Sequence, residues 1–196
     1  MELTTVRELY RSDLPAEDAE ITVGGWVRSV RASKTFGFIV LADGSFFKTL
    51  QIVYDESLAN FDALSRLNVG SAIIAKGKIV RTPDAPQPFE MHATSVEVEG
   101  ASTPDYPLQK KRHGLEFLRT IPHLRPRTNT FSAVFRVRSV AAYAIHKFFQ
   151  ERNFVYAHPP LITGSDAEGA GEMFKVTTIG YSEDYKSAEE YYADDF

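Results

Sequence analysis

Apolar and polar residues alternate along most of the first hundred positions, which is the two-residue period of half-buried β-strands. Asp43-Gly44 marks a turn, Gly77 marks a bulge or bend within a strand, and three prolines between residues 82 and 88 mark a loop. β-branched and aromatic residues are frequent between these markers. The pattern predicts five strands, at residues 21–30, 36–41, 49–54, 71–80 and 89–98.

Two segments near these strands have helical spacing instead. Residues 5–11 form an apolar i, i+3, i+4 pattern that predicts a short helix with Thr4 or Thr5 as its cap. Residues 58–67 carry Leu or Phe at every third position, which predicts an amphipathic helix between the third and fourth strands. Three strands, a helix and two strands is the order of an OB-fold, a five-stranded barrel that commonly binds oligonucleotides. Another small β-barrel is the alternative.

The pattern changes after residue 100. Four prolines between residues 100 and 129 prevent any long element and indicate a linker. An apolar stripe over 131–153 then predicts one long helix, and 154–158 a short strand that ends at Pro159-Pro160. The chain is therefore expected to be of the α+β class. Its expected domains are an OB-fold at 1–102, a hinge at 103–130 and the start of a further domain at 131–196.

Composition and charge limit the kinds of functional site that the chain can contain. The 196 residues include no cysteine, which excludes disulfides, thiolate catalysis and cysteine-ligated zinc, and the five histidines do not have zinc-site spacing. No apolar run approaches the ~20 residues of a membrane span. The net charge is −4, but residues 110–138 hold eight Lys or Arg and only one acid, Glu116. This basic stretch either faces phosphate or is a solvated linker.

The predicted strands also carry residues suited to single-stranded nucleic acid. Such binding needs flat rings for stacking, polar groups for base edges and cations for phosphates. Phe38 and Gln51 lie on the second and third strands, Arg31 follows the first and Glu90 begins the fifth. The competing interpretation places Phe36 and Phe38 in the barrel core.

Three stretches, residues 24–34 (GGWVRSVRASK), 38–45 (FIVLADGS) and 50–53 (LQIV), resemble the anticodon-binding domain of bacterial-type asparaginyl-tRNA synthetases, relatives of the aspartyl and lysyl enzymes. The resemblance implies that Phe38 stacks on the central uridine of the anticodon and that Gln51 reads the same base. It also implies that Glu90 and Arg31 contact the anticodon. The aspartyl pattern has a further arginine where this chain has Ser29, so that contact is not carried over.

Two later segments resemble parts of a class II synthetase catalytic domain. Residues 139–163 resemble motif 1, whose fixed proline matches Pro160 and whose role in the family is to build the homodimer interface. Proline suits this position because its φ is fixed and it has no N–H to satisfy. Residues 165–174 resemble the loop that closes over the amino acid, where Glu168 matches the glutamate that receives the substrate's α-ammonium group.

The resemblance implies a cytoplasmic enzyme that uses ATP and Mg²⁺ to activate asparagine and then charges tRNA(Asn). The two further class II motifs, each carrying an arginine for ATP phosphates, do not occur in these residues. The stretch alone is therefore expected to be inactive, with no catalytic residue, no metal ligand and no bound cofactor of its own. The alternatives are an aspartyl- or lysyl-type synthetase, a non-catalytic OB-fold that binds single strands, and a synthetase-like enzyme that makes free asparagine.

Overall fold

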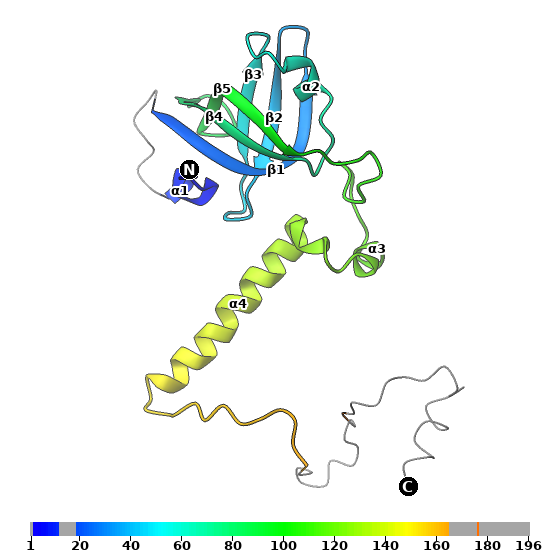
Figure 1. Ribbon diagram of the computed structural model, residues 1–196. Coiled ribbons are helices and arrows are strands. Elements are labelled where there is room, and N and C mark those ends of the chain that lie inside the picture. The colour runs from blue at the N-terminus through cyan, green and yellow to red at the C-terminus, as the bar shows by residue number, and fades with distance from the viewer. Residues whose placement is uncertain (1, 12–18, 165–175, 177–196) are drawn as a thin grey trace, which may run out of the picture. The chain divides into compact units, whose positions relative to one another are not determined.

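The computed structural model describes residues 2–11, 19–164 and 176 (Figure 1). Five strands form a closed barrel in the order β1-β2-β3-β5-β4. Neighbouring strands are antiparallel except for β3 and β5, which pair in parallel. The strands are β1 Glu20–Ala32, β2 Phe36–Ala42, β3 Leu50–Asp55, β4 Ala72–Arg81 and β5 Phe89–Gly100. This topology confirms the predicted OB-fold.

Helices accompany the barrel and follow it. The described residues form α1 Val6–Arg11, α2 Phe61–Ser65, α3 Leu115–Thr120, the 3₁₀ helix η1 Arg125–Arg127 and α4 Asn129–Gln150. Helix α2 is shorter than the predicted 58–67, and α3 and η1 lie in a segment for which no helix was predicted. No helix in the described part of the chain is long and apolar enough to cross a membrane.

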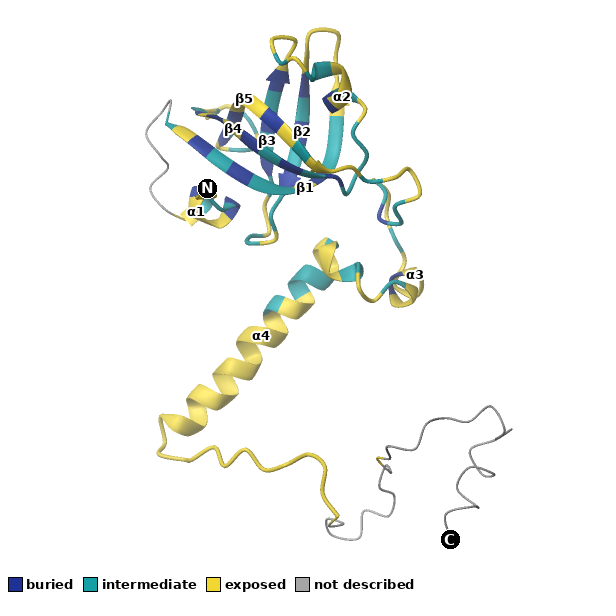
Figure 2. Cartoon of the chain, viewed as in Figure 1, coloured by how far each residue is buried: buried dark blue, intermediate teal, exposed yellow. Residues whose placement is uncertain are grey.

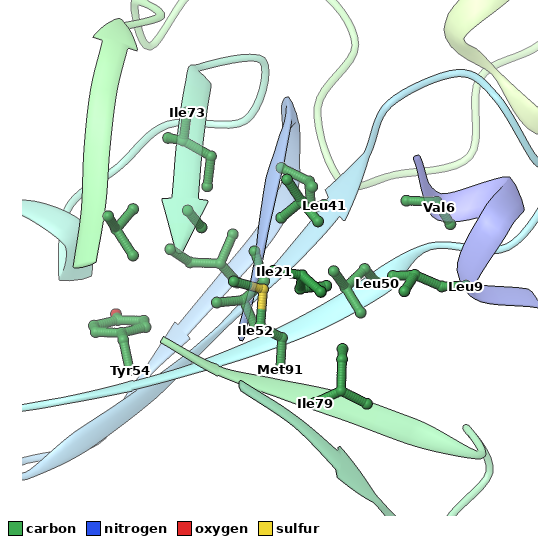
Figure 3. Packing of buried hydrophobic residues seen from close by; sticks show 14 of the residues in the cluster. Val6, Leu9, Ile21, Leu41, Leu50, Ile52, Tyr54, Ile73, Ile79 and Met91 are labelled. Atoms are coloured by element: carbon green, nitrogen blue, oxygen red, sulfur yellow. The ribbon is translucent and has the colours of Figure 1, made fainter. Parts of the chain in front are cut away.

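Inward-facing residues of the strands fill the barrel (Figure 3). The burial of β2 and β3 alternates strictly, so that every second side chain enters the core. Ile39, Leu41, Leu50, Ile52 and Met91 have no accessible surface. Full burial of a side chain of this kind contributes about 1.5–3 kcal/mol. The same alternation leaves the other half of each strand facing outward.

Two glycines allow the strands to approach closely. A Cβ on Gly37 would lie 2.4 Å from the ring of Tyr54, which is buried opposite it in the β2–β3 register. A Cβ on Gly77 would lie 2.1 Å from the carbonyl oxygen of His92, where the β4–β5 register shifts. This shift confirms the predicted irregularity at Gly77 and sets the local course of β5.

Helix α1 and helix α2 close opposite ends of the barrel. Val6 and Leu9 of α1 enter the core near the start of β3, where Tyr10 donates a hydrogen bond to the Thr49 carbonyl at 3.2 Å. At the other end of β3, the Tyr54 ring packs against Phe61 and its hydroxyl lies 3.2 Å from the Ser65 hydroxyl. The core is thus covered at both ends by short helices.

Helix α4 has no buried residue, in contrast to the barrel (Figure 2). Val137 and Tyr143 are each 68% exposed, and Phe148 is 49% exposed. The strand predicted at 154–158 is wrong: these residues are irregular and exposed. A strand requires a neighbour for its N–H and C=O groups, and none of the described residues pairs with this segment.

Candidate nucleic-acid interface

Four predicted site residues lie on one outer face of the barrel. Arg31 comes from β1, Phe38 from β2, Gln51 from β3 and Glu90 from β5, and these strands are consecutive neighbours in the barrel. Arg31 is directly opposite Phe38 in the register, and Gln51 is opposite Val40, two residues beyond Phe38. Residues directly opposite, or two apart on a strand, share a face. The four side chains therefore share one surface.

Phe38 is half-buried and does not belong to the core. The guanidinium carbon of Arg31 lies 5.8 Å from the centre of its ring, within range of a cation–π contact. The ring of Phe36, 42% exposed, meets Phe38 edge to face at 5.5 Å. The inward position on this strand is taken by Gly37 and Ile39 instead. Phe36 and Phe38 thus form an accessible aromatic surface beside a cation.

Polar groups lie beside this aromatic surface. Gln51 Nε2 donates a hydrogen bond of 3.0 Å to Glu90 Oε2. His92 Nε2 lies 3.0 Å from the other carboxylate oxygen, Glu90 Oε1. The side chain of Glu90 is only 17% exposed, whereas that of His92 is 52% exposed. Glu90 is therefore held between an amide and an imidazole.

His92 is a member of this surface that was not identified from the sequence. It lies opposite Val53 of β3 and two residues after Glu90 on β5, so it faces the same side. The two-residue spacing from Glu90 was the signal available in the sequence, because residues two apart on a strand share a face. The structure shows that its neighbour is a carboxylate.

Asp55 adds a second negative charge at the end of β3, opposite Phe36. The Ser57 hydroxyl and backbone N–H bond to its carboxylate and hold the pKa of Asp55 below its ordinary value, with a smaller contribution in the same direction from His92. The surface therefore combines stacking rings, an amide, carboxylates and cations. This set can stack a base, pair with its edge and approach a phosphate.

Several arginines of the basic stretch at 110–138 contact the protein itself. Arg127 lies over the Trp26 ring at 5.0 Å and donates to the Tyr106 hydroxyl at 3.1 Å. Arg136 lies over Phe47 at 4.9 Å. Residues 110–112, two lysines and an arginine, are exposed. Contact of this stretch with phosphate, one of the two interpretations of its charge, stays a prediction.

Of the two candidate residues from the expected catalytic domain, one lies within the described residues and the other does not. Pro160 lies in the exposed irregular segment after α4. Glu168 lies outside the described residues. Within residues 2–11, 19–164 and 176, no group of three His, Asp or Glu side chains is arranged to hold a metal ion.

Comparison with known families agrees with this architecture. Residues 21–99 match the family described as OB-fold nucleic acid binding domain, and residues 115–193 match tRNA synthetases class II (D, K and N). Two successive segments of the chain are therefore similar to a nucleic-acid-binding OB-fold and to the class II tRNA synthetases of this group.

Within that group, the chain is similar to the N-terminal portion of asparagine–tRNA ligases. It is 69% identical over 180 residues to the asparagine–tRNA ligase of Acetivibrio thermocellus, and 63% identical over 179 residues to that of Alkaliphilus oremlandii. Each alignment covers 91% of this chain but only 39% of the relative. The chain thus spans about two fifths of the length of these curated relatives.

A solved structure shares the fold. The asparaginyl-tRNA synthetase of Pyrococcus horikoshii complexed with asparaginyl-adenylate superimposes with a TM-score of 0.79 at 21% identity. The match covers 90% of this chain and 41% of that one. At this identity the likeness concerns the fold alone.

Proposed function

We propose that this chain is the anticodon-reading part, and the beginning of the catalytic domain, of an asparagine–tRNA ligase. The intact enzyme would activate asparagine with ATP and transfer it to tRNA(Asn) in the cytoplasm. The observation that carries the proposal is the gathering of Arg31, Phe38, Gln51 and Glu90 on one outer face of the barrel. The 69% sequence identity to an asparagine–tRNA ligase supports asparagine as the amino-acid substrate.

Each of these side chains has a role in the proposal. Phe38 stacks on a splayed base, because a half-buried ring on the outer face of the barrel offers one flat face to a ligand. Gln51 and Glu90 supply donors and acceptors for the edges of bases. Arg31 supplies positive charge next to the stacked base and steers the polyanion toward the surface.

The remaining assignments concern the intact enzyme. Glu168 would receive the α-ammonium group of asparagine, because a cation removed from water needs a carboxylate partner. Pro160 would lie in a homodimer interface. ATP would supply the adenylyl group that activates the carboxylate of asparagine, assisted by Mg²⁺; we assign no residue of this chain to either.

Binding to anticodon stem-loops tests the proposal. The 196-residue chain is expected to bind a stem-loop with the asparagine anticodon GUU more tightly than stem-loops with the aspartate anticodon GUC or the lysine anticodon UUU. Fluorescence anisotropy at fixed salt would give the three dissociation constants, since protein–RNA affinities are comparable only at one salt concentration. Equal affinity for all three and for an unrelated single strand would indicate a generic single-strand binder instead.

A second measurement concerns catalysis. The product of the complete gene is expected to exchange pyrophosphate with ATP in the presence of asparagine and much less with aspartate or lysine. Pyrophosphate exchange that depends on aspartate would indicate an aspartyl-type synthetase instead. Absence of exchange with any of the three amino acids would contradict a synthetase.

A further inference from the structure

Glu90 is flanked on both of its carboxylate oxygens. Gln51 Nε2 lies 3.0 Å from Oε2, and His92 Nε2 lies 3.0 Å from Oε1. An ionised carboxylate only accepts hydrogen bonds, so both neighbours must be the donors. His92 therefore carries its proton on Nε2. For the same reason Gln51 turns its amide nitrogen, and not its carbonyl oxygen, toward Glu90.

The position of His92 is fixed by the backbone on both sides. In the strand registers it is opposite Val53 of β3 and Lys78 of β4, so β5 is held between two neighbours at this point. The charged groups around it include Glu90 at 3.0 Å, Asp55 at the end of β3, and Lys78, which is opposite it on β4. Without His92, Gln51 would be the one remaining hydrogen-bond partner of the Glu90 carboxylate among the described residues.

A glutamine amide with a fixed orientation presents its free groups in a fixed order. Gln51 retains a carbonyl oxygen as acceptor and its second N–H as donor. The pairing edge of uracil reads acceptor, donor, acceptor, whereas that of cytosine reads donor, acceptor, acceptor. A glutamine free to rotate by half a turn could pair with either edge. A glutamine held by a carboxylate can match only one of these orders without leaving a polar group unpaired.

We propose that His92 is a positioning residue that, through Glu90, holds the Gln51 amide in one orientation and so makes the barrel distinguish uracil from cytosine. This inference rests on the proposed anticodon function and adds to it the source of base selectivity. His92 itself need not touch the RNA. Its hydrogen bond acts on the orientation of the group that does.

The test compares two stem-loops that differ only at the central anticodon nucleotide, uridine or cytidine, bound to the full 196-residue chain. The unmodified chain is expected to prefer uridine. His92→Ala is expected to reduce the ratio of the two dissociation constants by about tenfold, because one mismatched base contact is worth about that factor. His92→Gln is expected to restore most of the ratio, because its carboxamide also offers an N–H to Glu90.

Matched variants on the same strand complete the experiment. Glu90→Gln is expected to lower the ratio, because a carboxamide can donate to or accept from Gln51 and so releases its orientation. Glu97→Gln removes the same charge at an exposed position further along β5 and is expected to leave the ratio unchanged. Thermal unfolding of each variant verifies that the barrel is intact, and His92→Val, which also lacks a side-chain donor and suits a strand, replaces His92→Ala if that variant unfolds.

An unchanged ratio in His92→Ala, with the unmodified chain still selective, would overturn the inference and leave the proposed function standing. Equal loss in His92→Ala and His92→Gln would also overturn it, because the hydrogen bond to Glu90 would then not be what matters. If the unmodified chain binds neither stem-loop better than an unrelated strand, the proposed function itself fails.

Discussion

Phe38 faces outward because of its place in the two-residue period of β2. Gly37 and Ile39 on either side are buried, so the even positions of this strand must point away from the core. The sequence alone left core and surface open for this ring. The structure shows that the Phe38 side chain faces away from the core. Its role in binding stays a prediction.

Replacement of Phe38 by alanine removes the proposed stacking face. Binding of the GUU stem-loop is expected to weaken by about 1–3 kcal/mol, the usual value of one base–aromatic stack. Anisotropy titration gives the change. Phe47→Ala is the matched control, because Phe47 is a 53% exposed ring in the β2–β3 connection. Equal weakening by the two substitutions would contradict a specific stack at Phe38.

The Glu8 carboxylate, in the first turn of α1, accepts hydrogen bonds from Thr5 that affect its ionisation. The Thr5 backbone N–H and hydroxyl both donate to its carboxylate at 2.7 Å, and the Glu8 N–H bonds back to the Thr5 hydroxyl at 3.2 Å. This is a capping box, with Thr5 as the cap. These hydrogen bonds hold the pKa of Glu8 below its ordinary value.

The lowered pKa of Glu8 determines how its contribution to stability changes with pH. Its contribution is present above the pKa in the unfolded chain and is lost as the pH falls through the lower pKa of the folded state. The difference in unfolding free energy between the unmodified chain and Glu8→Gln is therefore expected to be present at about pH 6 and to shrink as the pH falls below about 4. Urea titrations at several pH values measure it. Glu99→Gln, at an exposed position on β5, should show no such pattern.

At the scale of elements, α1 is attached to the barrel by the turn that follows β2. Asp43 accepts the Val6 N–H at 2.7 Å, and Ser45 accepts the Arg7 N–H at 3.0 Å. The same carboxylate accepts the Ser45 N–H at 2.9 Å. Two free N–H groups in the first turn of α1, those of Val6 and Arg7, are therefore satisfied by a segment almost forty residues away in sequence.

Removal of the Asp43 side chain should loosen this attachment. Asp43→Ala is expected to destabilise the chain by about 1–3 kcal/mol, because the part-buried Val6 N–H loses a charged acceptor. Urea unfolding followed by the fluorescence of Trp26, the single tryptophan, gives the value. Asp84→Ala, in the exposed β4–β5 connection, is the control. A loss no larger than that of the control would show that the Asp43 side chain does not help to hold α1 on the barrel.

At the scale of the whole molecule, the hydrophobic core belongs to the barrel. All residues of the main buried cluster lie between Val6 and Val96. Helix α4 contributes none of them. Local stability follows the density of buried apolar contacts, so the two regions should open with very different free energies.

Hydrogen exchange checks this contrast. Amides of β2 and β3 in the full chain at low concentration are expected to exchange at least about a hundredfold more slowly than those of α4. Mass spectrometry of peptides spanning 36–55 and 131–150 measures the two rates. Equal protection of α4 in a dilute monomer would contradict the expectation. Protection that rises with protein concentration would indicate association through the exposed helix.

Much of the architecture follows from local sequence patterns. The alternation along β1 to β5, the Asp43-Gly44 turn and the long helix were predictable because side-chain period and turn chemistry act over a few residues. The strand expected at 154–158 failed because a strand depends on a distant partner, which local pattern does not report. The roles of Glu168 and Pro160 stay predictions that rest on resemblance.

The sequence by itself determined the five strands and the candidates Arg31, Phe38, Gln51 and Glu90. Only the tertiary structure decided that these four share an outer face and that His92 joins them. It also placed Asp43 at the start of α1. Closure of the barrel brings β3 and β5 together across almost forty residues of chain, and such pairing depends on register, because a shift of one residue would turn every side chain to the other face.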